Sequence, residues 1–368
     1  RPHLLLLLTA SLLLSTDALR PQRVAVVTGA SRGIGKGIAV ELGRAGFAVV
    51  CVGRSSRAGG GQTTERAAAE SDLTVEATAE AVTAAGGRGC AVSCDIGSDA
   101  DIERVLGKVA ADEGRLDMLV CSAYTTPPGP LRGPFWEQPM AMWDATCGVG
   151  LRGVYATCRA ATPIMIETAE ADGPAAPPPL ICLVSSFGGK AYTFNVPYGV
   201  GKAAVDRLAS DMALQLKPKR VASISLYPGV VRTEGNLEME RRGDWAEASG
   251  GLDLSCGETP AYSGKAVAAL AELGSDAMLG RSGGVEVVAE LAREFGFTEA
   301  DGSQPPSIRS LAYLCPNFVF PSIEQGGVTI PAWVRENVPD VLLPWSIFSE
   351  PPPEAPRSEV PGAGSVQN

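Results

Sequence analysis

Short apolar runs rich in β-branched residues alternate with stretches of helical periodicity from Arg23 onward. Continuous apolar runs are typical of strands buried on both faces of a parallel sheet, and the helical stretches between them are the crossovers that such a sheet needs. The pattern therefore predicts one α/β domain, a doubly wound parallel sheet with helices on both faces. The predicted strands are Val24–Thr28, Ala48–Val52, Gly89–Cys94, Met118–Ser122, Leu180–Ser185, Ala222–Tyr227 and Gly284–Val288.

Three segments lie outside this alternation. An apolar run at residues 4–14, followed by small residues, is typical of the hydrophobic region of a signal peptide, and it is shorter than the ~20 residues of a spanning helix. We expect residues 1–19 to be a targeting segment, 20–350 the folded domain, and 351–368 a disordered Pro-rich tail. A glycine-rich stretch at 57–72 predicts a flexible loop after the second strand.

The targeting segment predicts delivery to the endoplasmic reticulum or the secretory pathway. Membrane association through this segment stays open, and a cytoplasmic protein with a loosely held apolar arm is the alternative. The number of subunits is also open, with a homo-oligomer among the alternatives.

Composition excludes several classes of function. The chain of 368 residues is 45% hydrophobic, enough for one large core. Its net charge of −10 argues against nucleic acid as a partner, because no basic stripe offsets that charge. The single histidine, His3, lies near the start, which excludes mechanisms that need a histidine base. The nine cysteines form no disulfide framework, and Cys90 and Cys94 lack the further ligands of a zinc site, so no metal is expected.

A glycine-rich string follows the first predicted strand and opens a predicted helix at 36–44. It reads Thr28-Gly29-Ala30-Ser31-Arg32-Gly33-Ile34-Gly35. Gly29 permits a tight turn, Gly33 lets the backbone approach a pyrophosphate, and Gly35 lets the helix pack closely on the strand. Phosphates would then lie at a helix N-terminus, where free N–H groups and the helix dipole favour anions. The string therefore predicts a Rossmann-type dinucleotide site.

A second set of polar residues follows a predicted strand that ends in Ser185-Ser186. Tyr198 and Lys202 lie one helical turn apart, so their side chains share a face. A free tyrosine has a pKa of ~10 and is a poor acid at neutral pH. An ammonium roughly 4 Å away contributes ~4 kcal/mol at an effective dielectric constant of 20, which would lower that pKa by about three units. The spacing predicts Tyr198 as a proton donor whose pKa is lowered by Lys202.

Together these motifs resemble the short-chain dehydrogenase/reductase family, whose markers are a Thr-Gly-x-x-x-Gly-x-Gly loop and a Ser…Tyr-x-x-x-Lys set. Cys94-Asp95-Ile96 and Pro228-Gly229-Val-Val-Arg-Thr233 are further matches, and the resemblance covers roughly residues 22–290. The string Phe194-Asn-Val-Pro-Tyr198 is similar to the dehydrogenase/reductase branch of the family. The resemblance implies an oxidoreductase that transfers hydride between a nicotinamide dinucleotide and a carbonyl or alcohol.

The resemblance also implies roles for the matching residues. Tyr198 would donate the proton, Lys202 would also bond the nicotinamide ribose, and a serine would bind the substrate oxygen. Ser186 is preferred because the second serine of the pair usually acts, whereas the thirteen-residue spacing of many relatives would select Ser185. The implied cofactor-binding residues are Gly29, Ser31, Arg32, Gly33, Ile34, Gly35, Arg54, Asp95, Cys121, Tyr198, Lys202, Pro228, Val231 and Thr233.

The charge at the end of the second strand bears on the choice of cofactor. An NAD site usually has an acid there, which accepts from the ribose hydroxyls, but this strand ends in Gly53-Arg54. Arg54 and Arg32 could instead bind a 2′-phosphate, so the sequence predicts NADP(H), with solvated surface arginines as the alternative. Aromatic residues such as Phe187 and Tyr192 favour a small apolar carbonyl compound, or the matching alcohol, as substrate.

Two positions depart from the family's pattern. Its Asn-Asn-Ala-Gly string is replaced by Cys121-Ser122-Ala123-Tyr124, and the asparagine of Val-Asn-x-x-Gly, which holds a water linking the lysine to solvent, is replaced by Gly150. Two functions therefore stay open: an NADPH-dependent carbonyl reductase, and an NADP-binding scaffold with little turnover. The stretch 234–258, where relatives carry a mobile substrate loop, shows no pattern that would name the substrate.

Overall fold

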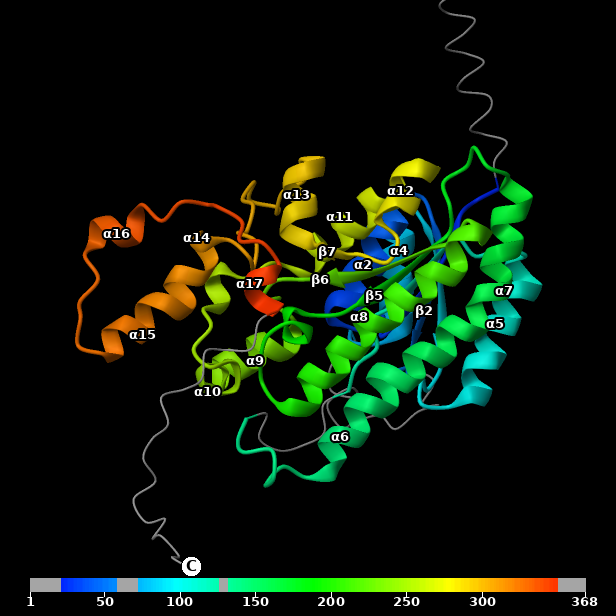
Figure 1. Ribbon diagram of the computed structural model, residues 1–368. Coiled ribbons are helices and arrows are strands. Elements are labelled where there is room, and N and C mark those ends of the chain that lie inside the picture. Colours follow the sequence, from blue (N-terminus) through cyan, green and yellow to red (C-terminus); the bar gives the residue numbers. More distant parts are fainter. Residues whose placement is uncertain (1–20, 58–71, 126–131, 350–368) are drawn as a thin grey trace, which may run out of the picture.

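The computed structural model describes residues 21–57, 72–125 and 132–349 (Figure 1). The predicted targeting segment, most of the glycine-rich loop and the Pro-rich tail lie outside the described residues. The described strands form one parallel sheet in the order β3-β2-β1-β4-β5-β6-β7. They are β1 (Val24–Thr28), β2 (Ala48–Gly53), β3 (Arg88–Ser93), β4 (Met118–Cys121), β5 (Leu180–Val184), β6 (Ala222–Tyr227) and β7 (Val285–Val287).

This sheet confirms the predicted fold class, and each predicted strand agrees with the structure within one residue at either end. The central strand β1 shows why the apolar runs are continuous. Val24 and Val26 pack into the core on one face of the sheet, and Ala25 and Val27 pack into the core on the other. Successive side chains of a strand point to opposite faces, so a strand covered on both faces needs apolar residues at every position.

Two layers of helices cover the sheet (Figure 1). One core lies between the strands and the first layer, and a second core lies between the strands and the other layer. The first layer consists of α2 (Gly33–Arg44), α4 (Val75–Ala84), α11 (Pro260–Ala271), α12 (Ser275–Arg281) and α13 (Val288–Phe295). The other layer consists of α5 (Asp99–Glu113), α7 (Val154–Asp172) and α8 (Val196–Leu216).

None of the described helices is both long and apolar enough to cross a membrane. Shorter elements complete the domain. Between the strands lie α6 (Met140–Cys147), the π-helical turn η1 (Gly148–Gly153), the 3-10 turns η2 (Phe187–Gly189), η3 (Lys217–Lys219) and η4 (Leu254–Cys256), α9 (Glu234–Arg242) and α10 (Trp245–Ser249). After α13 come α14 (Leu311–Leu314), the π-helical turn η5 (Cys315–Val319), α15 (Phe320–Gln325), α16 (Ala332–Glu336) and α17 (Ser346–Ser349).

Aromatic contacts attach this last segment, drawn in orange and red in Figure 1, to the end of the sheet. The ring of Trp345 meets that of Tyr227, the last residue of β6, edge to face at 5.8 Å. The ring of Phe348 meets that of Phe187 in the same way at 5.0 Å. The C-terminal segment therefore packs against the carboxyl ends of β5 and β6.

Candidate active site

The glycine-rich string lies where the strand order reverses. The chain leaves β1 toward β2 on one side, and β4 lies on the other side, so the loops after β1 and β4 diverge. Open α/β sheets bind ligands in the crevice at such a point. Gly29 has φ of +70°, and a Cβ there would lie 2.7 Å from Cα of Ala123 in the loop after β4. A Cβ on Gly35 would lie 2.3 Å from the carbonyl oxygen of Gly29, so the crevice admits only glycine at both positions.

The N-terminus of α2 opens into this crevice and already meets an acidic oxygen. The N–H of Gly33 donates to Oε2 of Glu234, at the start of α9, over 2.8 Å. The side chain of Arg32, the residue that precedes the helix, forms no capping bond. The first N–H groups of a helix have no partner within the helix and favour anions. The contact with Glu234 shows that an anion fits at Gly33.

Two arginines lie close to the end of β2. Arg32 donates to the hydroxyl of Ser55 over 3.2 Å, and the exposed Arg54 donates to the hydroxyl of Thr125 over 3.4 Å. The next arginine, Arg57, is paired with Glu80, whereas no carboxylate of the described residues pairs with Arg32 or Arg54. Both guanidinium groups are therefore available to an anionic ligand.

The other predicted cofactor residues divide into two groups. Four of them line the pocket that also contains Tyr198: Ile34, Pro228, Val231 and Thr233. Asp95 is exposed beyond β3 and accepts from the N–H of Gly97 over 2.9 Å, while Ser31 and Cys121 are buried. The Cys121 side chain packs into the core, so only its backbone can face a ligand. Within the described ranges, no cluster of histidine, cysteine and acidic residues could hold a metal ion.

Local sequence explains how Tyr198 and Lys202 are placed. Asn195 caps α8, its Oδ1 accepting from the N–H of Tyr198 over 2.9 Å, and Pro197 stands in the first turn, where its missing N–H costs nothing. One turn later, Nζ of Lys202 donates to the carbonyl oxygen of Val184 over 2.9 Å. The helix is thereby attached to the end of β5, and the Tyr198 side chain lines the pocket.

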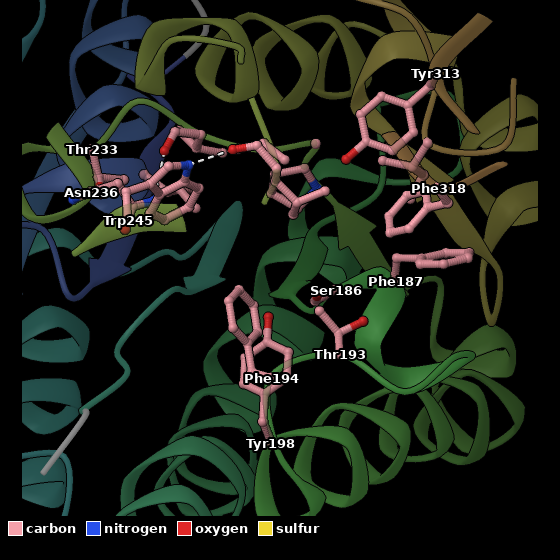
Figure 2. Close-up of a pocket in the computed structure, with 17 residues that line it drawn as sticks. Ser186, Phe187, Thr193, Phe194, Tyr198, Thr233, Asn236, Trp245, Tyr313 and Phe318 are labelled. Atoms are coloured by element: carbon pink, nitrogen blue, oxygen red, sulfur yellow. Dashed lines mark hydrogen bonds between the residues drawn. The ribbon is translucent and has the colours of Figure 1, made fainter. Parts of the chain in front are cut away.

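The two adjacent serines have different partners. Ser186 lines the pocket with Tyr198, and its Oγ accepts from the N–H of Gly188 over 3.1 Å. Ser185 is buried, and its hydroxyl donates to the backbone carbonyl of Lys202 over 3.2 Å. Successive side chains of an extended chain point in opposite directions, so only one of the pair can reach the pocket. Figure 2 shows Ser186 beside Thr193, with the Tyr198 hydroxyl directed into the pocket.

Close packing holds the Tyr198 ring in place. A Cβ on Gly188 would lie 2.5 Å from Cε1 of Tyr198, so the turn after β5 needs glycine there. Phe194 has φ of +61°, and its ring meets that of Tyr198 edge to face at 5.1 Å (Figure 2). A non-glycine residue in this region costs roughly 1–3 kcal/mol and persists only where the surroundings require it. That conformation brings the Phe194 ring against the phenol.

Burial controls the ionisation of both groups. It raises the pKa of Tyr198 to about 12, with the nearby hydroxyl of Ser186 acting in the opposite direction. It lowers the pKa of Lys202 to about 8, partly offset by the charge of Asp206. The expectation that Lys202 lowers the pKa of Tyr198 is therefore not met in this structure. Nζ of Lys202 bonds to Val184 and lies 5.8 Å from the centre of the phenol ring, so desolvation of the phenolate dominates.

The pocket around Tyr198 is largely apolar and draws on two segments to which the sequence analysis assigned no site residue. Trp245 and Leu252 come from the stretch 234–258, where Nε1 of Trp245 donates to the carbonyl oxygen of Leu252 over 2.6 Å. Ile308, Tyr313 and Phe318 come from the C-terminal segment. Figure 2 shows Tyr313 and Phe318 with Phe187 across the cavity from Trp245. The density of aromatic residues after residue 312 is the one sequence signal that pointed there.

The sequence matches known proteins over most of its length. The family model described as short chain dehydrogenase matches residues 23–243. Dehydrogenase/reductase SDR family member 1 of Mus musculus is 36% identical over 324 residues, which is 85% of this chain and 95% of that protein. An uncharacterised NAD-dependent oxidoreductase of Mycobacterium tuberculosis is 33% identical over 211 residues, covering 57% of this chain and 72% of that protein.

Solved structures share the fold. The 3-oxoacyl-(acyl-carrier protein) reductase of Brucella melitensis, solved in complex with NAD, superposes with a TM-score of 0.58 at 24% identity, covering 73% of this chain and 96% of that chain. The region matched by the family model runs from β1 to β6 and contains both the glycine crevice and the Tyr198–Lys202 turn. This chain therefore belongs to the short-chain dehydrogenase/reductase family of oxidoreductases.

Proposed function

We propose that this protein is an NADPH-dependent carbonyl reductase that interconverts a small apolar ketone or aldehyde and its alcohol. The observation that carries the proposal is that the hydroxyls of Ser186 and Tyr198 line one largely apolar pocket, with Lys202 one turn further along α8. Two hydroxyls at the carboxyl end of a parallel strand can hold a carbonyl oxygen and give it a proton.

A nicotinamide dinucleotide fits the crevice. Gly29 and Gly35 let the loop after β1 and the start of α2 pack tightly, and a Cβ on Gly33 would come no closer than 3.4 Å to another residue. The N–H of Gly33, which donates to a carboxylate, can donate equally to a phosphate. When bound, the nucleotide supplies the hydride of the reduction. The residues that would hold it are the predicted set: Gly29, Ser31, Arg32, Gly33, Ile34, Gly35, Arg54, Asp95, Cys121, Tyr198, Lys202, Pro228, Val231 and Thr233.

Tyr198 acts as the acid, and Ser186 binds the same substrate oxygen. With a pKa of about 12, Tyr198 holds its proton at neutral pH and can give it to a carbonyl oxygen that gains charge. The phenolate left behind costs about 3 kcal/mol more than that of a free tyrosine. An ammonium roughly 4 Å away offsets this by ~4 kcal/mol at an effective dielectric constant of 20. Lys202 therefore has to turn from Val184 toward the phenol during the reaction.

We also propose NADPH rather than NADH as the cofactor. Arg54 stands where an NAD site carries an acid, and neither Arg54 nor Arg32 is paired with a carboxylate in the described part of the chain. A relative is named as NAD-dependent, and one solved neighbour holds NAD, so the fold alone does not choose between the two nucleotides. The arginine at the end of β2 supports NADP(H) here.

A second function, an NADP-binding scaffold with little turnover, is favoured by two observations. Gly150 stands where the family's pattern has an asparagine, and burial raises the pKa of Tyr198. The Ser186–Tyr198 pair and the pocket beside it favour the enzyme, because a scaffold needs neither a proton donor nor a substrate site.

The two functions are separated by following NADPH oxidation with the full chain and a panel of ketones, quinones and steroids. The Tyr198→Phe variant should lose turnover by about 10²–10⁴-fold, because the proton donor is gone. Its affinity for NADPH should stay near that of the parent, since the ring still packs. Turnover within tenfold of the parent would contradict the role of Tyr198. A parent protein that binds NADPH and reduces none of the panel would favour the scaffold.

A further inference from the structure

Tyr124 fills the space beside Gly150. Gly150 lies in the π-helical turn η1, and a Cβ there would lie 3.3 Å from Cδ2 and 3.4 Å from Cε2 of the Tyr124 ring. An asparagine side chain at position 150 extends beyond its Cβ and needs the volume that this ring occupies. The two side chains therefore exclude each other unless the ring moves.

The Tyr124 ring also contacts both members of the tyrosine–lysine pair. Nζ of Lys202 lies 5.2 Å from the centre of the Tyr124 ring. The rings of Tyr124 and Tyr198 meet edge to face, with centres 6.0 Å apart. An ammonium within about 6 Å of the centre of an aromatic ring is attracted by its electron density. Tyr124 thus offers the ammonium of Lys202 an attraction in addition to its bond to Val184.

Contacts on the far side keep the Tyr124 ring in place. The hydroxyls of Tyr124 and Thr146 are hydrogen-bonded at 3.3 Å, and Thr146 is buried on α6. A Cβ on Gly201, inside the Tyr198–Lys202 turn, would lie 2.5 Å from Cγ2 of Thr146. The loop after β4, α6 and the first turns of α8 are therefore packed as one unit around Lys202.

We propose that Tyr124 is a positioning residue for Lys202, taking over the place that an asparagine at position 150 has in the family's pattern. The two departures from that pattern are then one coupled replacement, in which the glycine makes room and the tyrosine ring fills it. This inference rests on the proposed function, in which Lys202 stabilises the phenolate of Tyr198.

A double-mutant cycle between positions 124 and 150 tests the coupling. Gly150→Asn alone should lower kcat by about tenfold, because the asparagine displaces the ring from Lys202. Tyr124→Gly alone should also lower kcat, because it leaves the space empty. The double variant should recover to within about threefold of the parent, since the asparagine then has its space. Gly150→Ala, which adds only the Cβ, is the matched control and should change kcat little.

The pH dependence of kcat separates positioning of Lys202 from mere packing. Tyr124→Leu removes the ring and should move the alkaline limb of the profile about half a unit lower, because the ammonium loses its attraction to the ring. Tyr124→Phe loses the hydrogen bond to Thr146 but keeps the ring beside Lys202, so it should shift the limb clearly less than Tyr124→Leu does. The other titratable groups around Lys202 are Tyr198 and Asp206 on α8, Tyr227 on β6, which donates to Asp206, and Cys147 on α6 near Tyr124.

Three results would overturn the inference: full activity of Gly150→Asn, a double variant no better than the product of the single effects, or equal profiles for Tyr124→Leu and Tyr124→Phe. A parent protein without turnover would contradict the proposed function instead. In that case the double-mutant cycle would be measured with the dissociation constant of NADPH, between pH 6 and 9, in place of kcat. This readout is suitable because the family resemblance implies that Lys202 bonds to the nicotinamide ribose. Coupling in that constant supports the inference, and additivity refutes it.

Discussion

At the scale of single residues, the charge of Arg54 carries the proposed choice of cofactor. A charge-assisted bond to a 2′-phosphate contributes ~1.5–3 kcal/mol, roughly ten- to a hundredfold in affinity. Arg54→Asp should therefore reverse the preference from NADPH to NADH, because it removes an attraction and adds a repulsion. Arg32→Ala should weaken NADPH more than NADH without reversing the order.

Titration of both nucleotides into the parent and these variants measures the effect. Arg57→Ala serves as a control, because Arg57 is a neighbouring arginine already paired with Glu80. Equal affinities of the parent for NADPH and NADH, or an Arg54→Asp protein that still prefers NADPH tenfold, would mean that these arginines are solvated surface charges.

Single residues also mark where sequence reasoning stops. The pair Ser185-Ser186 is recognisable from its place at the end of a predicted strand. The thirteen-residue spacing to the tyrosine in many relatives selects Ser185, whereas the usual role of the second serine in the family selects Ser186. The direction of the extended chain at the end of β5 turns Ser186 to the pocket and Ser185 to the backbone of α8. A similar limit applies to the pKa of Tyr198, because it depends on how deeply the phenol is buried.

At the scale of elements, the start of α9 competes with the cofactor. Glu234 places its carboxylate on the N–H of Gly33, where a phosphate would bind. Glu234→Gln should therefore tighten NADPH binding by about three- to tenfold, because the competing charge and its repulsion of the phosphates are removed. Fluorescence titration at low and high salt measures this, and the gain should shrink as salt rises.

The exposed Glu240 on the same helix offers the matched control, Glu240→Gln, which changes the net charge by the same amount. If both variants shift the affinity equally, the general charge of the helix is responsible. Weaker binding by Glu234→Gln would show that the carboxylate supports the site and does not compete for it.

A buried acid holds the loop that follows β6. Glu258 is 1% exposed, its Oε1 accepts from the hydroxyl of Ser263 over 3.1 Å, and its backbone pairs with Val230 and Arg232. Burial raises the pKa of Glu258 from 4.5 to about 8. The folded state therefore keeps a proton that the unfolded state loses above pH 4.5. The stability that this protonated carboxyl contributes is complete below pH 4.5 and is lost as the pH rises toward 8.

Between pH 5 and 8 the free energy of unfolding of the parent should fall, relative to Glu258→Gln, by about 1.4 kcal/mol for each pH unit. The glutamine keeps the shape and removes the titration, so the difference between the two proteins isolates this group. Urea unfolding at several pH values measures the slope. Parallel pH profiles for the two proteins would mean that Glu258 is ionised in the folded state at neutral pH.

Elements differed in how well the sequence predicted them. The predicted strand ends agree with the observed ends within one residue, because the β-branched runs are bounded by glycine and polar residues and are buried on both faces of the sheet. The helices α10 and α14 to α17 are too short to show helical periodicity. Helix α9 is longer, but it buries none of its side chains and so has no apolar face to recognise. Contacts with distant residues stabilise them, such as the bond of Glu234 to Gly33 and the packing of Trp345 on Tyr227.

At the scale of the whole molecule, we propose that residues 1–19 are a targeting signal that does not take part in the fold. The first described strand begins at Val24, and the described strands form one seven-stranded sheet. A chain without residues 1–19 should bind NADPH with the affinity of the parent and unfold cooperatively, but should no longer reach the endoplasmic reticulum. Nucleotide titration of the purified protein and imaging of tagged chains in cells measure both effects.

A chain without residues 351–368 is the control for trimming an end of the protein. Loss of nucleotide binding or of cooperative unfolding only when residues 1–19 are removed would show that this segment packs into the domain. If the chain without residues 1–19 still reached the endoplasmic reticulum, the targeting signal would lie elsewhere in the sequence.

Local patterns were enough to predict the parallel sheet, the glycine crevice and the Tyr198–Lys202 turn. Each depends on a short-range rule: the period of apolar residues, the φ that a tight turn needs, and the spacing of one helical turn. Other features depended on which distant segments meet in space. Tertiary packing decided which serine reaches the pocket, and it placed residues of the C-terminal segment in the pocket lining. It also placed the Tyr124 ring in the space beside Gly150. Burial, which no short window of sequence encodes, moved the pKa of Tyr198 up and that of Lys202 down.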